Sequence, residues 1–214
     1  SQALLRAVAH SRRTTMAQVV CADFGLPLIA KGVPVISQSG DAAEINVDKM
    51  ILKRVGVLPH GLINTQEKFG PGGSTLREYA RWVAQRVKQL AEPTYQPTLH
   101  FDVYGFMGSE LGLRPERIAA FICQLAKDVA PLRLHVEYPA DFGSREAQIE
   151  GYSALRTLLD DSRTHARIVV DERCNTLEDV RAFAAARAAH LIQIKTPDLG
   201  SIENTVLAVQ ACKE

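Results

Sequence analysis

The 214-residue sequence lacks an excess of charge of either sign, because 25 Lys and Arg residues stand against 24 Asp and Glu residues. Proteins that bind nucleic acid usually carry a basic excess, so we expect no nucleic-acid partner. The sequence also lacks an apolar run of roughly 18 residues, the length that crosses a bilayer, and it lacks a signal-peptide pattern. We therefore expect no membrane association.

Paired cysteines are missing as well. The four cysteines are far apart, with no Cys-x-x-Cys pair and no regular framework; they are Cys21, Cys123, Cys174 and Cys212. This spacing favours a reducing, cytoplasmic location over secretion. The composition, with 46% hydrophobic and 23% charged residues, is that of an ordinary soluble globular protein.

Both ends resemble interior parts of a longer chain. No initiator Met is present, residues 1–20 carry a helical apolar pattern from the start, and residues 202–214 are helical in pattern to the last residue. Complete domains usually end in a loop or a frayed tail. We therefore expect a fragment in which residues 1–31 form a helix and linker, and residues 32–214 form the main domain.

From residue 32 onward, a short apolar strand followed by an amphipathic helix recurs. The predicted strands cover residues 33–37, 57–63, 98–104, 132–138, 167–172 and 191–196, and the predicted helices between them cover 46–54, 75–91, 115–129, 145–160 and 177–189. Strands that alternate with helices of this length indicate βαβ units and a parallel sheet. A (β/α)₈ barrel and a doubly wound open sheet both fit this pattern.

The faces of the strands favour the barrel. In strand 98–104, His100, Asp102 and Tyr104 share one face and apolar residues the other, whereas an open parallel sheet is apolar on both faces. No glycine-rich phosphate loop follows the first strand. A polar face near the carboxyl ends of strands is typical of a barrel mouth. The sequence therefore predicts an α/β fold, a TIM-type (β/α) barrel truncated to about six βα units.

Three carboxylates and one amine stand at the ends of successive predicted strands. Asp102, Glu137, Asp171 and Lys195 are separated by 35, 34 and 24 residues, each one βα repeat. Adjacent strand ends lie about 5 Å apart, so the acids should converge, and a cation between them would keep them ionised. Oxygen ligands without His or Cys favour Mg²⁺. Any single acid could instead cap a helix or form an ion pair.

Lys195 has two possible roles, and three further residues, His60, Gln38 and Gln193, are candidates at the same rim. Lys195 is either a counter-ion for the acids or a general base whose pKa is lowered by partial burial near Mg²⁺. His60, at the end of the second predicted strand, is either structural or catalytic. Gln38 follows the first predicted strand and could hold a substrate carboxylate, and Gln193 faces the same cavity as Lys195.

A divalent ion beside an amine base suits removal of a weakly acidic proton next to a carboxylate. The ion stabilises the dianionic, enediolate-like species that results. A Lys or His base with Mg²⁺ is the site type of the enolase superfamily, which this reasoning therefore reaches from the residues.

Four motifs resemble the methylaspartate ammonia-lyase family, whose members are also called 3-methylaspartases. They are VLPHGLIN at 57–64, HFDVYG at 100–105, VDERCN at 170–175 and IQIKTPDLG at 192–200. The resemblance covers essentially the whole chain. It implies an enolase-superfamily lyase that reversibly eliminates ammonia from L-threo-3-methylaspartate to give mesaconate, with Mg²⁺ and stimulation by K⁺.

The resemblance also implies roles for the candidate residues. Asp102, Glu137 and Asp171 would hold the metal, and Lys195 would take the C3 proton. His60 would lie on the other face, contacting a substrate carboxylate and serving the epimeric substrate. Gln38 and Gln193 would hydrogen-bond the substrate. The family further implies a cytoplasmic homodimer in glutamate degradation, a capping domain of which residues 1–31 are a remnant, and a Thr and a Cys contact beyond residue 214.

Two residues depart from the family pattern beside the expected ligands. Tyr138 stands where the family usually has Gly, and Arg173 where it usually has Trp, so specificity or metal geometry could differ. Two other hypotheses therefore stay open. One is another enolase-superfamily enzyme, such as a racemase, cycloisomerase or acid-sugar dehydratase; the other is a non-catalytic barrel fragment that binds only a metal or a partner.

Overall fold

The computed structural model describes residues 2–29, 31–40 and 42–213, and a five-stranded parallel sheet lies at its centre. The strands are hydrogen-bonded in the order β1–β2–β3–β4–β5, so that neighbours in sequence are neighbours in space. They comprise β1 (Val57–Leu62), β2 (Thr98–Asp102), β3 (Arg133–Glu137), β4 (Ala166–Val170) and β5 (Leu191–Ile192). This order is that of successive βαβ units and confirms the predicted parallel α/β architecture.

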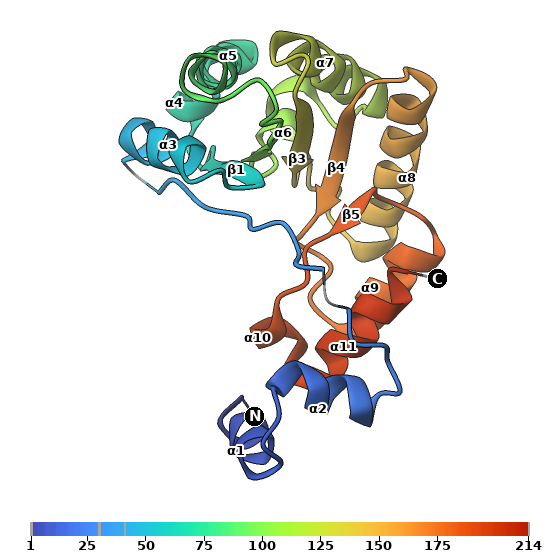
Figure 1. The fold of residues 1–214 in the computed structure, drawn as a ribbon. Coiled ribbons are helices and arrows are strands. Elements are labelled where there is room, and N and C mark those ends of the chain that lie inside the picture. The colour runs from blue at the N-terminus through green and yellow to red at the C-terminus, as the bar shows by residue number, and fades with distance from the viewer. Residues whose placement is uncertain (1, 30, 41, 214) are drawn as a thin grey trace.

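Helices α3, α5, α7 and α8 cover one face of this sheet (Figure 1). The helices are α1 (Gln2–Ser11), α2 (Met16–Asp23), α3 (Ala43–Leu52), α4 (Gln66–Phe69), α5 (Ser74–Leu90), α6 (Phe106–Leu111), α7 (Pro115–Asp128), α8 (Arg145–Asp161), α9 (Leu177–Ala185), α10 (Thr196–Leu199) and α11 (Ile202–Ala211), with a 3₁₀ turn at Pro71–Gly73. None of the described helices combines the length and apolarity that crossing a bilayer requires.

The hydrophobic core lies between the sheet and these helices. Every second strand residue points toward the helices, and these residues are apolar and fully buried: Leu99, Phe101, Leu134, Val136 and Ile168. The alternate residues point to the opposite face, which carries the polar side chains. This two-residue period is the one that the sequence predicts, and it leaves a polar inner face next to an apolar outer face.

Residues 33–37, predicted as the first strand, form only an isolated bridge to β1 at Ile36. The N–H of Val57 donates to Val35 O (3.0 Å), and the N–H of Ser37 donates to Val57 O (3.1 Å). Val33 is 85% exposed, and Pro34 has no N–H to offer a ladder. The segment therefore follows the β1 edge in parallel but is too sparsely bonded to be a regular strand.

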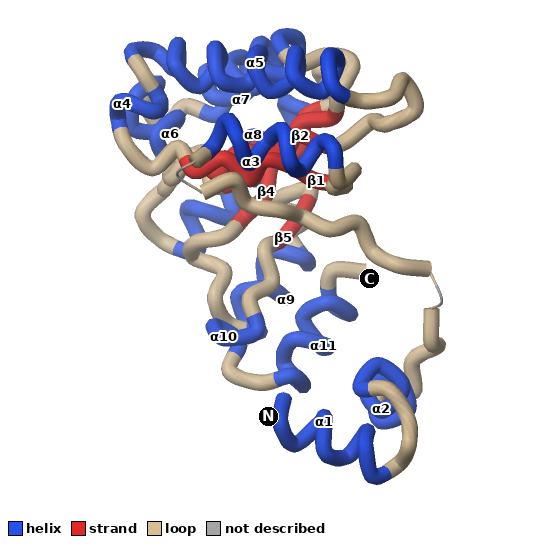
Figure 2. The backbone as a smooth tube through the Cα atoms, turned by 60° about the vertical axis from the view of Figure 1, so that its left-hand side comes forward, coloured by secondary structure: helices blue, strands red, loops and turns tan. Residues whose placement is uncertain are grey.

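The prediction of one helix over residues 1–20 is wrong for the residues described, and Ser1 lies outside them. The chain turns at Arg13, whose φ is 51°, and α2 starts again behind Thr15. Thr15 and Gln18 form a capping box, which satisfies free N–H groups at the start of α2. Figures 1 and 2 show α1 and α2 as a pair away from the sheet, joined to it by an extended segment.

The last predicted strand and the last predicted helix are both shorter than expected. Strand β5 stops at Ile192, because Lys195 and Thr196 already begin α10. Helix α11 ends at Ala211, and Glu214 lies outside the described residues. Lys195 is thus placed at the cap of a helix rather than within a strand.

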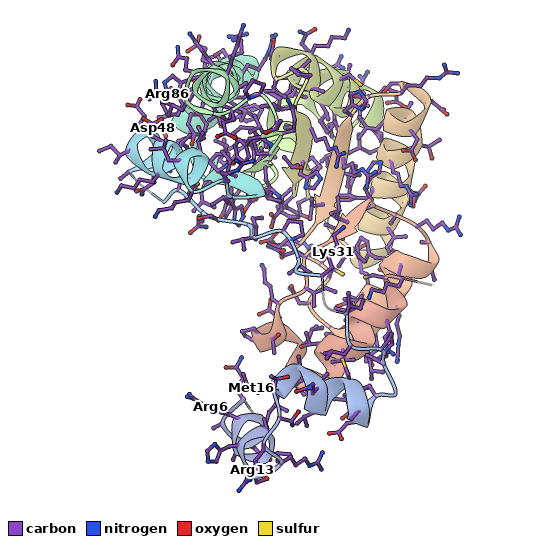
Figure 3. All side chains as sticks on the ribbon, in the orientation of Figure 1. Arg6, Arg13, Met16, Lys31, Asp48 and Arg86 are labelled. Carbon is purple, nitrogen blue, oxygen red and sulfur yellow. The ribbon has the colours of Figure 1, made fainter. Side chains whose placement is uncertain are left out.

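Two bidentate ion pairs join the outer helices. Arg77 of α5 donates to both carboxylate oxygens of Asp128 in α7 (2.6 and 3.1 Å). Arg86 of α5 binds Asp48 of α3 in the same way (2.8 and 2.6 Å; Figure 3). Paired guanidinium–carboxylate contacts fix geometry as well as charge, so they hold α3 and α7 against α5.

Candidate active site

The polar inner face forms two rows of side chains across β2 and β3. Parallel pairing sets His100 opposite His135, and two residues further along it sets Asp102 opposite Glu137. His100, Asp102 and Glu137 are 4%, 6% and 1% exposed, so the pairing places ionisable groups in a buried layer. Strand order then brings the end of β4, with Asp171, beside Glu137.

His60 enters this layer through a β-bulge. Pro59 pairs with His100 and Gly61 with Phe101, so His60 is an extra residue in β1 that has no partner on β2. Its φ is 44°, in the left-handed region that a residue with a Cβ adopts at a cost. Such bulges are common beside active sites because they re-aim one side chain. Here the bulge places Nε2 of His60 3.4 Å from Glu137 Oε2.

Glu137 is the centre of the arrangement. Its Oε2 lies 2.5 Å from Nε2 of His100, and its Oε1 accepts a hydrogen bond from the Gln193 amide at 3.4 Å. Burial alone would raise the pKa of Glu137, but the His100 hydrogen bond and the nearby His60 lower it overall. The Glu137 carboxylate in turn raises the pKa of His60.

Lys195 and Asp171 form a direct ion pair. The ammonium of Lys195 donates to Asp171 Oδ2 at 2.7 Å, whereas Oδ1, 2.5 Å from the same nitrogen, is buried without an aligned donor. Burial raises the pKa of Asp171 to about 6 even though Lys195 acts against it.

The contacts of Lys195 with protein groups raise its pKa, whereas the lowered pKa expected beside bound Mg²⁺ stays a prediction. Burial is the largest single effect and acts to lower the pKa of Lys195, but the hydrogen bond and the charge of Asp171, together with the charges of Glu172 and Asp198, outweigh it, and the pKa is raised. The residue is only half-buried, so its loss of hydration is too small to expel the proton against a carboxylate in contact. In the contacts shown here, Lys195 acts as a counter-ion for Asp171.

Asp102 is the least neutralised of the three acids. The only hydrogen bond to its carboxylate from the described residues comes from the Tyr104 N–H, at 3.3 Å to Oδ1. Burial, followed by repulsion from Glu137, raises the pKa of Asp102 to about 7. A buried carboxyl beside another carboxylate is stabilised in its ionised form by a nearby cation, so Asp102 is suited to bind one.

Gln38 stands apart from the other candidates. Ser39 N–H donates to Pro59 O at 2.8 Å, which continues the register of Ile36 and Val57 and sets Gln38 opposite Pro59. The alternation from Ile36 assigns Gln38 to the inner side, but the residue is exposed and has no hydrogen bond within the described part of the chain. The structure joins Gln193 to the site and leaves Gln38 at its edge.

One residue of the layer escaped the sequence prediction. His100 lies two positions before Asp102, so the alternation that indicated Asp102 also indicated His100. Its ring packs edge-on against His60 (centroids 4.9 Å apart) and against His135 (5.8 Å). Within the described chain, one set of possible ligand atoms lies within 4.8 Å of one another, on His60, His100 and Glu137, and Asp102 and Asp171 are outside it.

The residues of the three-carboxylate rim nevertheless fit a hard cation. Asp171 Oδ1 is a buried oxygen whose one close cation, the Lys195 ammonium, is not aligned for a hydrogen bond, and the Asp102 carboxyl has little within the protein to stabilise its ionised form. Carboxylate oxygens from three adjacent strand ends are the donor type that Mg²⁺ prefers. The assignment of these three acids as metal ligands stays a prediction.

Tyr138 and Arg173 adjoin this rim in a left-handed backbone conformation. Their φ values are 46° and 68°, and Tyr104 beyond Asp102 has 48°. Arg173 reaches Asp141 Oδ2 at 3.1 Å, and Asp141 also lies near the Tyr138 phenol, whose pKa is raised, mainly by burial. The two departures from the family pattern are therefore joined to each other through Asp141.

Comparison with known proteins places this arrangement among relatives. A family model described as methylaspartate ammonia-lyase C-terminus matches residues 27–214. Methylaspartate ammonia-lyase 1 of Carboxydothermus hydrogenoformans is 48% identical over 214 residues, covering 100% of this chain and 51% of the relative. The chain thus spans about half the length of the curated relatives it matches.

Solved structures of methylaspartate ammonia-lyases are also similar to this chain. The Citrobacter amalonaticus methylaspartate ammonia-lyase containing (2S,3S)-3-methylaspartic acid superimposes with a TM-score of 0.95 at 45% identity, covering 99% of this chain and 52% of that one. The Mg complex of Clostridium tetanomorphum β-methylaspartase gives 0.94 at 42% identity, with 99% and 52% coverage. Muconate lactonizing enzyme of Pseudomonas putida gives 0.58 at 17% identity, over 91% and 46% of the chains, and shares the fold alone. By sequence along nearly its whole length, the chain belongs to the methylaspartate ammonia-lyase family.

Proposed function

We propose that this chain supplies the metal- and base-bearing part of a lyase that reversibly eliminates ammonia from L-threo-3-methylaspartate to give mesaconate. The Lys195–Asp171 pair, facing Glu137 and Gln193 across one rim, is the observation that carries the proposal. The family match and the relative that contains (2S,3S)-3-methylaspartic acid support the substrate.

In this proposal Asp102, Glu137 and Asp171 hold Mg²⁺. The Asp171 oxygen that lies beside Lys195 without an aligned donor and the oxygen-only donor set support this assignment, as does the Mg complex of the Clostridium relative. When bound, the ion would stabilise negative charge that builds up on a substrate carboxylate as the neighbouring C–H proton leaves.

Lys195 is the base that takes the C3 proton. To accept it, Nζ must be neutral, so the proton that Lys195 donates to Asp171 must first pass to solvent. A cation held by Asp171 would offset the charge of that carboxylate and so favour the neutral amine. His60, across Glu137 from this pair, would contact a substrate carboxylate and serve the epimeric substrate. The Gln193 amide, already turned into the layer, would hydrogen-bond the substrate, and Gln38 would do so from the edge.

Three properties that the family resemblance implies belong to the same proposal. They are stimulation by K⁺, assembly as a homodimer, and a cytoplasmic location in glutamate degradation. Metal-dependent turnover with and without K⁺, and the mass in solution by light scattering, would test the first two.

The Lys195→Ala enzyme tests the base assignment. We expect a loss of roughly 10²–10⁴ in turnover, the usual contribution of a positioned general base, with Mg²⁺ affinity retained by calorimetry. Ultraviolet absorbance of the unsaturated diacid measures turnover. Asp171→Asn is the paired variant, in which Mg²⁺ binding itself should weaken. Full activity in the Lys195 variant would refute the assignment of Lys195 as the base. Unchanged Mg²⁺ affinity in the Asp171 variant would refute the assignment of Asp171 as a metal ligand.

A second candidate is another enolase-superfamily reaction, such as racemisation or cycloisomerisation with the same metal and base. The Tyr138–Asp141–Arg173 group beside the ligands favours it, because this group alters the surface next to the reacting centre. A panel of carboxylic-acid substrates separates the two, since only the lyase releases ammonia.

A further inference from the structure

We propose that His60, His100 and Glu137 form a second metal site, which takes a borderline ion of the Zn²⁺ class. The three ligand atoms come from three adjacent strands and lie within 4.8 Å of one another. This set is distinct from the three-carboxylate rim, with which it shares only Glu137.

The two distances to the Glu137 oxygen lie within an ångström of those in an occupied site. Zn²⁺ binds His nitrogen and carboxylate oxygen at about 2.0–2.2 Å, so two ligands in a tetrahedral site lie about 3.3 Å apart. Nε2 of His60 and Oε2 of Glu137 are already 3.4 Å apart. Nε2 of His100 and the same oxygen are 2.5 Å apart and must separate by slightly under an ångström.

One ligand atom has no well-aligned hydrogen bond. Nε2 of His60 is buried and has no hydrogen-bond partner among the described residues, although it faces Glu137. A buried nitrogen without a partner costs free energy that a metal bond would recover. The bulge holds this imidazole in the layer by adopting a left-handed backbone.

The donor types separate this site from the Mg²⁺ rim. Two imidazoles and one carboxylate are the ligand set of hydrolytic zinc centres, whereas Mg²⁺ prefers oxygen and retains water. Glu137 can turn Oε2 toward the histidines while Oε1 remains with Gln193. The side chain of His60 is 17% exposed against 5% for His100, so an ion would enter past His60 and keep an open position on that side.

Occupation of the second site interferes with the proposed lyase chemistry. His60 would be bound to the ion and unable to contact a substrate carboxylate, and Glu137 would be drawn away from the carboxylate rim. We therefore expect Zn²⁺ to inhibit turnover at concentrations where Mg²⁺ supports it. This consequence rests on the proposed function, but the binding site itself does not.

The test is Zn²⁺ binding to the chelator-treated protein by calorimetry, with the visible absorption of bound Co²⁺ as a second readout. His100→Gln is the informative variant, because its amide can still donate to Glu137 but cannot replace the imidazole as a ligand. His135→Gln is the matched control, because it removes the neighbouring inner-face histidine that lies outside the set. We expect His100→Gln to lose roughly 100-fold or more in Zn²⁺ affinity and the Co²⁺ band, and His135→Gln to keep both.

Mg²⁺ titration of the same proteins separates the two sites. His100→Gln should keep its Mg²⁺ affinity, while Asp102→Asn should lose Mg²⁺ affinity and keep Zn²⁺ affinity. Equal Zn²⁺ affinity in the wild type and His100→Gln, or no Zn²⁺ binding in the wild type, would overturn the second site. Zn²⁺ binding that depends on His100 in a protein that binds no Mg²⁺ would support this site and refute only the carboxylate rim of the proposed function.

Discussion

Replacing His60 by glycine and by alanine would measure the strain that the bulge stores. With φ at 44°, any residue that carries a Cβ sits in a region that costs roughly 1–2 kcal/mol, and glycine avoids this cost. Glycine loses about 0.5–1 kcal/mol through its freer unfolded chain. The strain equals or exceeds this entropic loss, so we expect the free energy of unfolding of His60→Gly to exceed that of His60→Ala by about 0–1.5 kcal/mol.

Urea denaturation followed by circular dichroism gives this difference directly, and in thermal melts about 1 kcal/mol corresponds to roughly 2–4 °C at this chain length. Gln85, exposed in the middle of α5, supplies the matched pair. There the order should reverse, with alanine more stable than glycine by about 1 kcal/mol. If His60→Ala proved more stable than His60→Gly by about the same amount as in the Gln85 pair, the strained-bulge account would be wrong. Both His60 variants lose the imidazole, so their activities should fall alike.

Two further predictions concern the packing around the sheet. The Arg77 guanidinium lowers the pKa of Asp128 below its ordinary 3.8, so the pair stabilises the fold above that pH and loses its effect as pH falls through the lowered pKa. Asp128→Asn should therefore cost about 1 kcal/mol near neutrality, with the gap to the wild type closing in acid; a gap constant with pH would contradict this. At Gly108 a Cβ would meet the Ala140 Cβ at 2.7 Å, so Gly108→Ala should cost about 1–3 kcal/mol in denaturant melts. Adding Ala140→Gly should recover part of the loss, because the Leu113 Cδ2 contact at 2.9 Å remains, and strict additivity would refute the clash.

Local periodicity accounts for what the sequence predicted well. The two-residue period assigned Leu99 and Phe101 to the core and Asp102 to the inner face, and it also assigned Lys195 to the side of Gln193. Strand order follows from the short βαβ connections, so the neighbourhood of Asp102, Glu137 and Asp171 could be foreseen from spacing alone.

Features set by tertiary contact could not be foreseen. The bulge at His60 inserts one extra residue into β1, so a regular two-residue alternation predicts the wrong side for the residues on one side of it. The pKa of Lys195 depends on the distance to Asp171, which is fixed by where β5 gives way to α10. Helices α4, α6 and α10 have four to six residues, too few for a periodic apolar face.

The left-handed residues that follow each carboxylate limit how this rim can diversify. Positions 104, 138 and 173 have positive φ just beyond the strand ends, one or two residues after the carboxylates of the rim. Substitution there can reshape the mouth while the carboxylates keep their places. The choice is narrow, because β-branched residues and proline are poorly tolerated at such dihedral angles, whereas Gly, Asn and Asp are accepted. A mutant library aimed at new substrates should therefore draw on that restricted alphabet at these three positions, so that few of its members are lost to misfolding.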